Sequence, residues 1–130
     1  MMKTILTLAA FALIGAAPVA AADQPATQID IALSNFKFTP ATVTLEHGRA
    51  YTLHITDTAS GSHDLVAKAF FAGAAIAPAD RRQISKGAIS FEGGETIDIH
   101  LVAPGPGTYE MHCSHFMHSA FGMTGKIVVR

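Results

Sequence analysis

The sequence predicts an all-β fold, a two-sheet antiparallel sandwich of Greek-key type with one short helical insertion around residues 66–85. Two observations lead to this prediction. From Gln28 onward apolar residues recur at about every second position, which is the period of half-buried strands rather than of helices. Glycine and proline turns separate these short runs, and such spacing is typical of a β sandwich.

The expected strands follow one another along the chain. The first contains Ile29, Ile31 and Leu33, and its alternation slips at Ser34-Asn35, where a bulge or a crossing between sheets would fit. The later strands are expected around Val43 and Leu45, Tyr51 to Ile55, Ile89 and Phe91, Ile97 to Leu101, Tyr109 to Cys113, and Ile127 with Val129.

An alanine-rich stretch between about Val66 and Ser85 interrupts the strand pattern. Proline is favoured in the first turn of a helix, and glycine commonly follows the last turn. Pro78 and Gly87 therefore predict the start and the end of one short helix in this insertion.

The first 22 residues have the three parts of a secretory signal peptide: a basic start at Lys3, an apolar run, and small residues ending at Ala22. The apolar run is shorter than the roughly 20 residues that span a bilayer. We therefore expect cleavage after Ala22, a single domain over residues 23–130, a periplasmic location and no membrane insertion after cleavage.

Charge and cysteine content narrow the functional classes. Only 15% of the residues are charged and the formal net charge is −1, with no basic stripe that would neutralise phosphates. The sequence therefore predicts no nucleic-acid partner. Cys113 is the single cysteine, so an internal disulfide is impossible and the thiol is expected to be either buried or bound to a metal. We expect a monomer.

Metal ligation is favoured by the residues around that cysteine. Four residues separate Cys113 from His118, and four more separate His118 from Met123, on a loop between two expected strands. Upstream, His63 follows a Gly-Ser turn. A thiolate, two imidazoles and a thioether suit copper, and this set is the donor set of blue-copper electron-transfer sites.

The chain resembles the cupredoxins of the plastocyanin and azurin type in this Cys-x4-His-x4-Met loop, in the Gly-Lys-Ile-Val-Val strand after it, and in the histidine about fifty residues upstream. The resemblance implies a cupredoxin-like sandwich and one copper ion, cycling between Cu(I) and Cu(II), held by His63, Cys113, His118 and Met123. The chain also departs from the family pattern at one position. Many members have asparagine after the upstream histidine, where it ties the ligand loops together, whereas this chain has Asp64.

Other histidines stay outside the predicted ligand set. Strand parity places Tyr109, Met111 and Cys113 on one face and His112 on the other, which predicts a half-exposed surface residue. A His-Cys pair can link two copper sites in two-domain relatives, but one short domain makes that unfavourable here. His115 is interpreted as a loop residue and is the obvious substitute if His118 does not reach the metal.

The resemblance implies a soluble one-electron carrier rather than an enzyme. Redox protein partners are expected to dock near His118, Phe116 and Phe121, where an apolar rim surrounds the ligand histidine. The alternative is a periplasmic copper-handling protein that sequesters or delivers Cu(I), or confers copper tolerance, through the same site. The many methionines and histidines of the loop favour that alternative.

Overall fold

The computed structural model describes Gly15 and residues 25–115 and 123–130. Apart from Gly15, the predicted signal peptide lies outside these residues, so its cleavage stays a prediction. Within the described ranges, no helix has both the length and the apolar character needed to cross a membrane.

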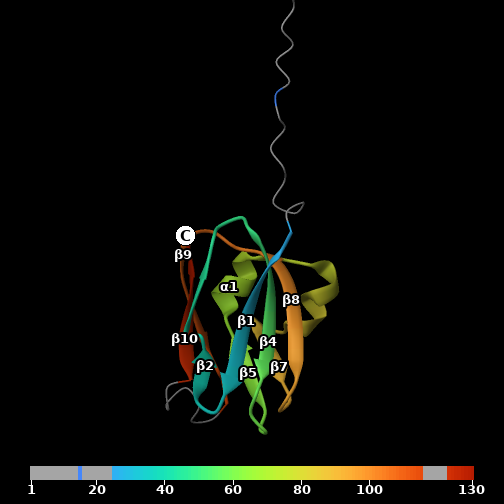
Figure 1. Ribbon diagram of the computed structural model, residues 1–130, viewed down its shortest axis with the longest axis vertical. Coiled ribbons are helices and arrows are strands. Elements are labelled where there is room, and N and C mark those ends of the chain that lie inside the picture. The colour runs from blue at the N-terminus through green and yellow to red at the C-terminus, as the bar shows by residue number, and fades with distance from the viewer. Residues whose placement is uncertain (1–14, 16–24, 116–122) are drawn as a thin grey trace, which may run out of the picture.

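In the described part of the chain, ten strands form two five-stranded sheets packed face to face (Figure 1). The first sheet has the order β2-β1-β4-β8-β6 and contains β1 (Thr27–Ser34), β2 (Lys37–Thr39), β4 (Ala50–Asp57), β6 (Ala75–Ile76) and β8 (Thr96–Val102). The second has the order β3-β10-β9-β5-β7 and contains β3 (Thr42–Leu45), β5 (His63–Val66), β7 (Ala88–Phe91), β9 (Gly107–His112) and β10 (Thr124–Val129). The predicted sandwich is confirmed.

The pairing within the sheets is mixed, which corrects the prediction of purely antiparallel sheets. β1 pairs with β4 in parallel, and β10 pairs with β3 in parallel, while the other pairings are antiparallel. Between β1 and β4 the chain forms β2 in the first sheet and β3 in the second. Because the chain crosses to the second sheet and back, β4 returns beside β1 in the same direction.

The slip in the alternation at Ser34-Asn35 is a tight hairpin rather than a bulge. Ser34 pairs with Lys37, and the two residues between them include Phe36 at a positive φ of 62°. The crossing between sheets follows only after β2. Side-chain parity changes here because the chain reverses direction, not because a residue is inserted into a strand.

The insertion contains two short helical segments where the sequence predicted one. α1 (Lys68–Gly73) precedes the edge strand β6, and the 3-10 helix η2 (Pro78–Gln83) follows it. Pro78 begins the second segment as predicted, but that segment ends at Gln83, before Gly87. Pairing of β6 with β8 separates the two helices, because it gives the backbone between them strand partners.

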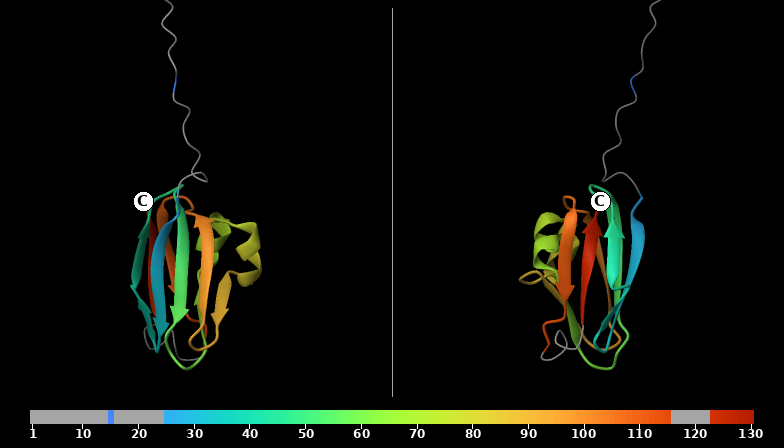
Figure 2. Two further views of the ribbon diagram at one scale, coloured as in Figure 1. Left: turned by 45° about the vertical axis from the view of Figure 1, so that its right-hand side comes forward. Right: turned by 90° about the vertical axis from the view of Figure 1, so that its left-hand side faces the viewer.

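The helices cover one flank of the sandwich (Figure 2). Phe70 of α1 is fully buried and meets Tyr109 of β9 edge to face, with ring centroids 5.7 Å apart. Gly73, the last residue of α1, lies against Pro104. The insertion therefore packs along β9 in the direction away from Cys113, which follows the opposite end of that strand.

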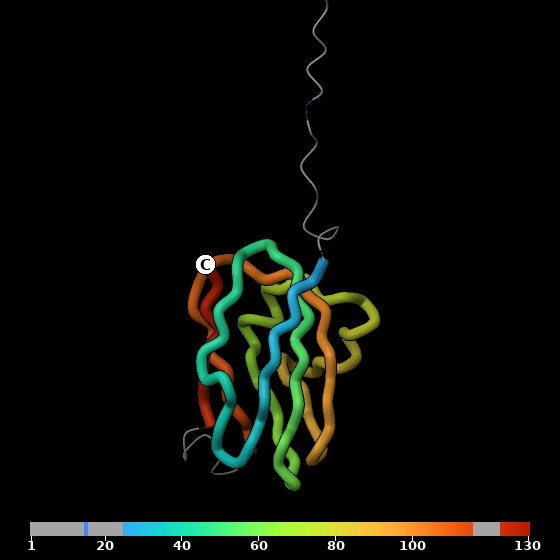
Figure 3. Tube along the Cα trace, in the orientation of Figure 1, coloured from blue at the N-terminus to red at the C-terminus, as the bar shows by residue number. Residues whose placement is uncertain are grey.

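Alternate residues of both sheets form an apolar core, for example Leu33, Leu53 and Ile99 from the first sheet and Leu45, Ile89 and Ile127 from the second. In the tube of Figure 3 the chain enters the first strand and leaves the last one at the same end of the sandwich. The connection between β4 and β5, residues 58–62, lies at the other end. We call this the site end.

Candidate metal centre

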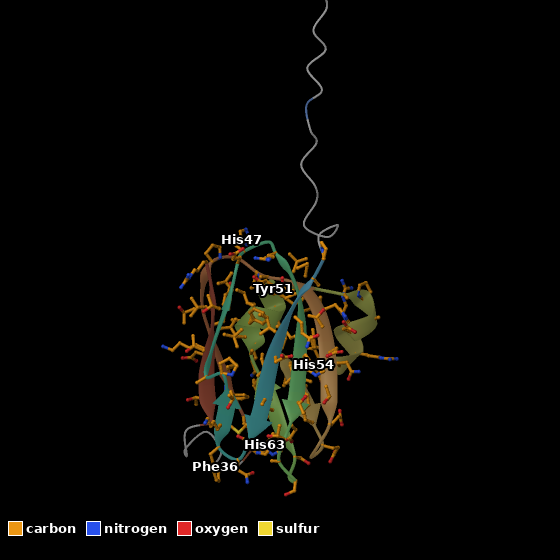
Figure 4. The ribbon with its side chains drawn as sticks, viewed as in Figure 1. Phe36, His47, Tyr51, His54 and His63 are labelled. Atoms are coloured by element: carbon orange, nitrogen blue, oxygen red, sulfur yellow. The ribbon has the colours of Figure 1, made fainter. Side chains whose placement is uncertain are left out.

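His63 begins β5 directly after the β4–β5 connection. It pairs with Phe91 of β7, so its side chain points inward and is only 1% exposed. The connection packs tightly against the turn that follows β7. A Cβ added to Gly93 in that turn would lie only 2.2 Å from the Ser60 carbonyl oxygen. A glycine at position 93 therefore lets the chain deliver His63 into the interior. Figure 4 shows His63 at the site end of the ribbon.

The imidazole of His63 is held by a buried carboxylate. Its Nδ1 lies 3.2 Å and 3.1 Å from the two carboxylate oxygens of Asp57, the last residue of β4. Asp57 is 0% exposed and also accepts a hydrogen bond from the backbone amide of Ala59 at 3.0 Å. A carboxylate that accepts from both groups orients the ring of His63 within the core.

Cys113 and Met123 lie at the two ends of the predicted ligand loop. Cys113 directly follows β9, and Met123 directly precedes β10. The amide of Cys113 donates to the Met123 carbonyl at 3.1 Å, which extends the pairing of these strands, and both residues are 0% exposed. In Figure 2, β9 ends and β10 begins at the site end. Two sulfur donors are thus brought together at the same buried end as His63.

The environment of the Cys113 thiol contains opposing influences. Burial raises the pKa of this thiol, backbone hydrogen bonds from Asp64 and His115 lower it, and the nearby Asp64 carboxylate raises it again. The net pKa lies above its ordinary value. Amide donors aimed at sulfur favour the thiolate, and a bound cation would offset burial and the carboxylate. The surroundings therefore suit a metal-bound thiolate better than a free one.

Asp64 joins the two segments that carry the predicted ligands. Its carboxylate accepts a hydrogen bond from the Ser114 amide at 2.6 Å and another from the Ser114 hydroxyl. The residue is 7% exposed and ties the start of β5 to the segment after β9, fifty residues later. Asp64 thus makes the tie that asparagine makes in many cupredoxins, and it adds a negative charge.

His115 is a further possible metal ligand among the described residues. Ligand atoms of Asp64, Cys113 and His115 all lie within 4.8 Å of one another, and His115 is half-buried. Its ring stacks over that of His63, with centroids 6.2 Å apart and planes 7° apart. The sequence interpreted His115 as a loop residue and possible substitute ligand, and the structure places it beside the thiol.

Three of the four predicted ligands, His63, Cys113 and Met123, are buried at the site end, while His118 lies outside the described residues. The complete ligand set stays a prediction. His112 is half-exposed on the outer face of the second sheet, as parity predicted. Asp57 was not among the site residues predicted from the sequence. It stands in phase with the buried residues Tyr51, Leu53 and Ile55, and a carboxylate at an inward strand position is the signal that could have found it.

The donors fit copper on their own chemistry. A buried thiol with amide donors, an imidazole fixed by a carboxylate and a buried thioether form a soft, mixed sulfur and nitrogen set. Thioether ligation is not part of typical zinc sites. A single copper ion is the metal that this set favours.

Comparisons with known proteins agree with this fold. The family model of the cupredoxin-like domain matches residues 4–129. No curated protein sequence matches the chain. Auracyanin from Roseiflexus castenholzii is similar in structure, with a TM-score of 0.60 at 21% identity, over 82% of this chain and 99% of that one.

Two further structures show the same likeness. Auracyanin A, described as a blue copper protein from Chloroflexus aurantiacus, matches with a TM-score of 0.57 at 20% identity, over 82% of this chain and 100% of that one. A multicopper oxidase from Pseudomonas thermotolerans matches with a TM-score of 0.62 at 21% identity, over 81% of this chain and 30% of that one. Such distant likeness establishes the fold, and the family model covers nearly the whole sequence: the chain belongs to the cupredoxin family, and the family and the donor set together imply one copper ion.

Proposed function

We propose that the protein is an exported one-electron carrier with a mononuclear type 1 copper site formed by His63, Cys113, His118 and Met123. Copper bound there supplies the couple between Cu(I) and Cu(II). The observation that carries the proposal is the buried Cys113: its amide donates to the Met123 carbonyl, and the amide of the next residue, Ser114, donates to the Asp64 carboxylate.

This arrangement suits electron transfer because its donors are fixed by the protein rather than by the metal. His63 is held by Asp57, and Ser114 is held by Asp64, so the segments that carry the ligands are cross-linked within the sandwich. Donors that keep their positions in both oxidation states lower the reorganisation that accompanies each transfer. The scaffold therefore favours repeated one-electron cycling over metal release.

The partners that we propose are redox proteins that dock at the site end. The expected docking residues His118, Phe116 and Phe121 lie outside the described residues. Phe36 adds support, because it is an exposed large apolar side chain, 43% exposed, in the β1–β2 turn at the same end (Figure 4). Aromatic side chains are enriched at protein interfaces, and contacts between electron-transfer partners are small and transient.

Copper handling is the second candidate, and the cluster of Asp64, Cys113 and His115 is the observation that favours it. Together with the predicted ligands, this cluster offers more donor atoms than one four-coordinate copper ion needs. A half-buried histidine at the edge of the site would give copper a route for exchange. Retention of copper against a Cu(I) chelator separates the candidates, since a carrier keeps its metal and a delivery protein releases it.

The visible absorption spectrum of the Cu(II)-loaded protein tests the main proposal. We expect an intense band from the Cys113 thiolate that disappears on reduction with ascorbate and returns on oxidation. The band should be missing from Cys113→Ser. A colourless protein that binds Cu(I) but shows no reversible band would contradict the electron-carrier function and favour copper handling.

A further inference from the structure

The insertion between β5 and β7, residues 67–87, differs in charge from the rest of the domain. It contains four basic side chains and one carboxylate, formally +3, whereas the other described residues contain four basic side chains and eight carboxylates, formally −4. The four cations of the insertion are all exposed: Lys68, Arg81, Arg82 and Lys86. The domain therefore has a positive flank on an otherwise negative molecule.

Folding brings together cations that are spread along the sequence. Lys68, the first residue of α1, packs against the turn that contains Lys86. A Cβ added to the neighbouring Gly87 would lie only 2.7 Å from the Cα atom of Lys68. Arg81 of η2 lines a surface hollow together with Phe71 of α1. The two helices and the turn after them thus carry one set of cations, which we call the basic surface, on the flank shown in Figure 2.

The positive charge of the basic surface is not neutralised within the described chain. None of its four cations forms a salt bridge with a described residue. The carboxylate of the insertion, Asp80, instead accepts hydrogen bonds from the backbone amide and the ring of His100. Exposed cations without a salt bridge attract external anions, over a range of about 10 Å at 0.1 M salt. The basic surface therefore favours contact with an anionic partner.

The site end has the opposite charge. Its carboxylates are Asp57 and Asp64, which are buried, and Glu92 and Glu95 in the turn after β7, while Lys37 in β2 offsets one of these charges. In Figure 1 the helices of the insertion lie on the flank, toward the opposite end of the sandwich. A negatively charged surface would therefore attract the insertion and repel the site end.

We propose that the basic surface binds the protein reversibly to an anionic lipid bilayer, with the site end directed away from the lipid. The inference rests on the export that is part of the proposed function, because an exported protein meets the phospholipid headgroups of a membrane. Each Lys or Arg near an anionic membrane strengthens binding by about fivefold. Four cations can thus hold the domain at the surface weakly, without insertion of an apolar segment.

An acidic redox protein fits the basic surface less well than a bilayer does. The insertion packs along β9 in the direction away from Cys113, so a redox protein bound there would be remote from the metal. A lipid surface requires no complementary shape, only exposed cations on one flank. It also leaves the site end open to redox partners. Charge and position together therefore favour lipid as the occupant.

Sedimentation with phospholipid vesicles tests the inference, with the copper-loaded protein in its exported form. We expect the protein to sediment with vesicles that contain phosphatidylglycerol, to stay in solution with pure phosphatidylcholine vesicles, and to dissociate as the salt concentration rises toward about 0.2 M. Equal binding to the neutral vesicles, or no binding to the anionic ones, would overturn the proposal. The absorption band of the same samples reports on the copper site, so a failure of the proposed function is recorded separately.

The double variant Arg81→Gln/Arg82→Gln removes two of the four cations from an exposed position. We expect its partition onto the anionic vesicles to fall by about 30-fold, since each lost charge weakens binding by about fivefold. Lys37→Gln/Lys126→Gln makes the same change in net charge outside the insertion, and Asp98→Asn removes an exposed carboxylate from the outer face of the first sheet. Both controls should leave vesicle binding nearly unchanged.

Two outcomes of these variants would contradict the proposal. Equal losses in the two double variants would show that net charge governs binding, and not the basic surface. Retention of the protein on immobilised polyglutamate, without sedimentation on the anionic vesicles, would overturn the lipid assignment and favour an acidic protein as the occupant.

Discussion

The interior of the sandwich differs between the site end and the remainder of the core. Away from the site the inward positions hold aliphatic and aromatic side chains such as Leu45, Leu53 and Phe70. The buried polar or charged residues of the described chain are Asp57, His63 and Asp64, and all three belong to the β4–β5 connection or its borders. One sandwich therefore contains an apolar part that stabilises the fold and a polar part that stabilises it little or not at all.

This difference shows what the fold contributes to the site. Each buried polar group at the site end has a partner that fixes its direction: Asp57 holds His63, and Asp64 holds Ser114. Such groups contribute little net stability, because the hydrogen bonds offset the loss of hydration. The apolar part of the core must supply the free energy that keeps these groups out of water. Substitutions in the two regions should then have separable effects.

The largest loss of stability is expected in the apolar region, from Phe70→Ala. The ring is 0% exposed and packs edge to face on Phe71 and Tyr109, so its removal should lower the free energy of unfolding by about 3–5 kcal/mol. Denaturant unfolding measures the loss, and the copper absorption band should survive below the transition. Phe36→Ala removes the same group from an exposed position and serves as the control. A lost band in a folded Phe70→Ala protein would show that the two regions are coupled.

A smaller loss of stability, together with a change at the site, is expected for Gly93→Ala. The added methyl group would lie 2.2 Å from the Ser60 carbonyl oxygen, so the connection that leads to His63 must move. We expect a destabilisation of about 1–3 kcal/mol and weaker copper binding, measured by thermal unfolding and by titration with copper.

Gly61→Ala is the matched control for this change, because its new Cβ meets no atom within 4 Å. It should leave both the unfolding temperature and copper binding nearly unchanged. Equal effects of the two alanines would mean that the connection tolerates displacement and does not position His63.

Asp64→Asn should alter the redox property of the site more than its stability. The amide has nearly the shape of the carboxylate and can still accept from the Ser114 amide, but it lacks the negative charge near Cys113. That charge favours Cu(II) by on the order of 2 kcal/mol at an effective dielectric constant near 20. The midpoint potential should therefore rise by about 90 mV, measured by redox titration of the absorption band. A potential that stays constant, or that moves equally in Asp98→Asn, would exclude a local charge effect.

The period of the apolar residues was enough to predict the sandwich, because inward positions such as Ile31, Leu53 and Ile99 must alternate with outward ones in any half-buried strand. The same period could not reveal β5. Its four residues are all buried, so they show no alternation. Parallel pairing of β1 with β4 was also missed, since it depends on where the chain crosses between sheets and not on local pattern.

At the site, spacing predicted Cys113 and Met123 as ligands because both lie on one loop between paired strands, and the structure buries both at the site end. Asp57 and the tie from Asp64 to Ser114 join segments that are distant in sequence, so only the folded chain shows their contacts. Residue type and local spacing thus predict which side chains can bind a metal. The contacts that orient those side chains depend on the packing of the two sheets.

The smallest effect is expected at the outer face of the first sheet, where Asp80 of η2 accepts hydrogen bonds from both the backbone amide and the ring of His100 at 2.8 Å. Slight burial raises the pKa of Asp80, but these hydrogen bonds and the charges of His100 and Arg82 lower it further, so the net pKa lies below its ordinary value of 3.8. A lowered pKa in the folded state means that the ionised form stabilises the fold. This stabilisation is present above about pH 4 and is lost as the pH falls through the folded-state pKa.

Asp80→Asn should therefore cost less than about 1 kcal/mol at neutral pH, because the pair is close to solvent. Between pH 5 and pH 3 the stability of the variant should fall less steeply than that of the parent, since the variant has no carboxylate to protonate at this position. Thermal unfolding across that pH range measures both slopes. Parallel slopes would show that the contact between η2 and β8 contributes no acid-dependent stability.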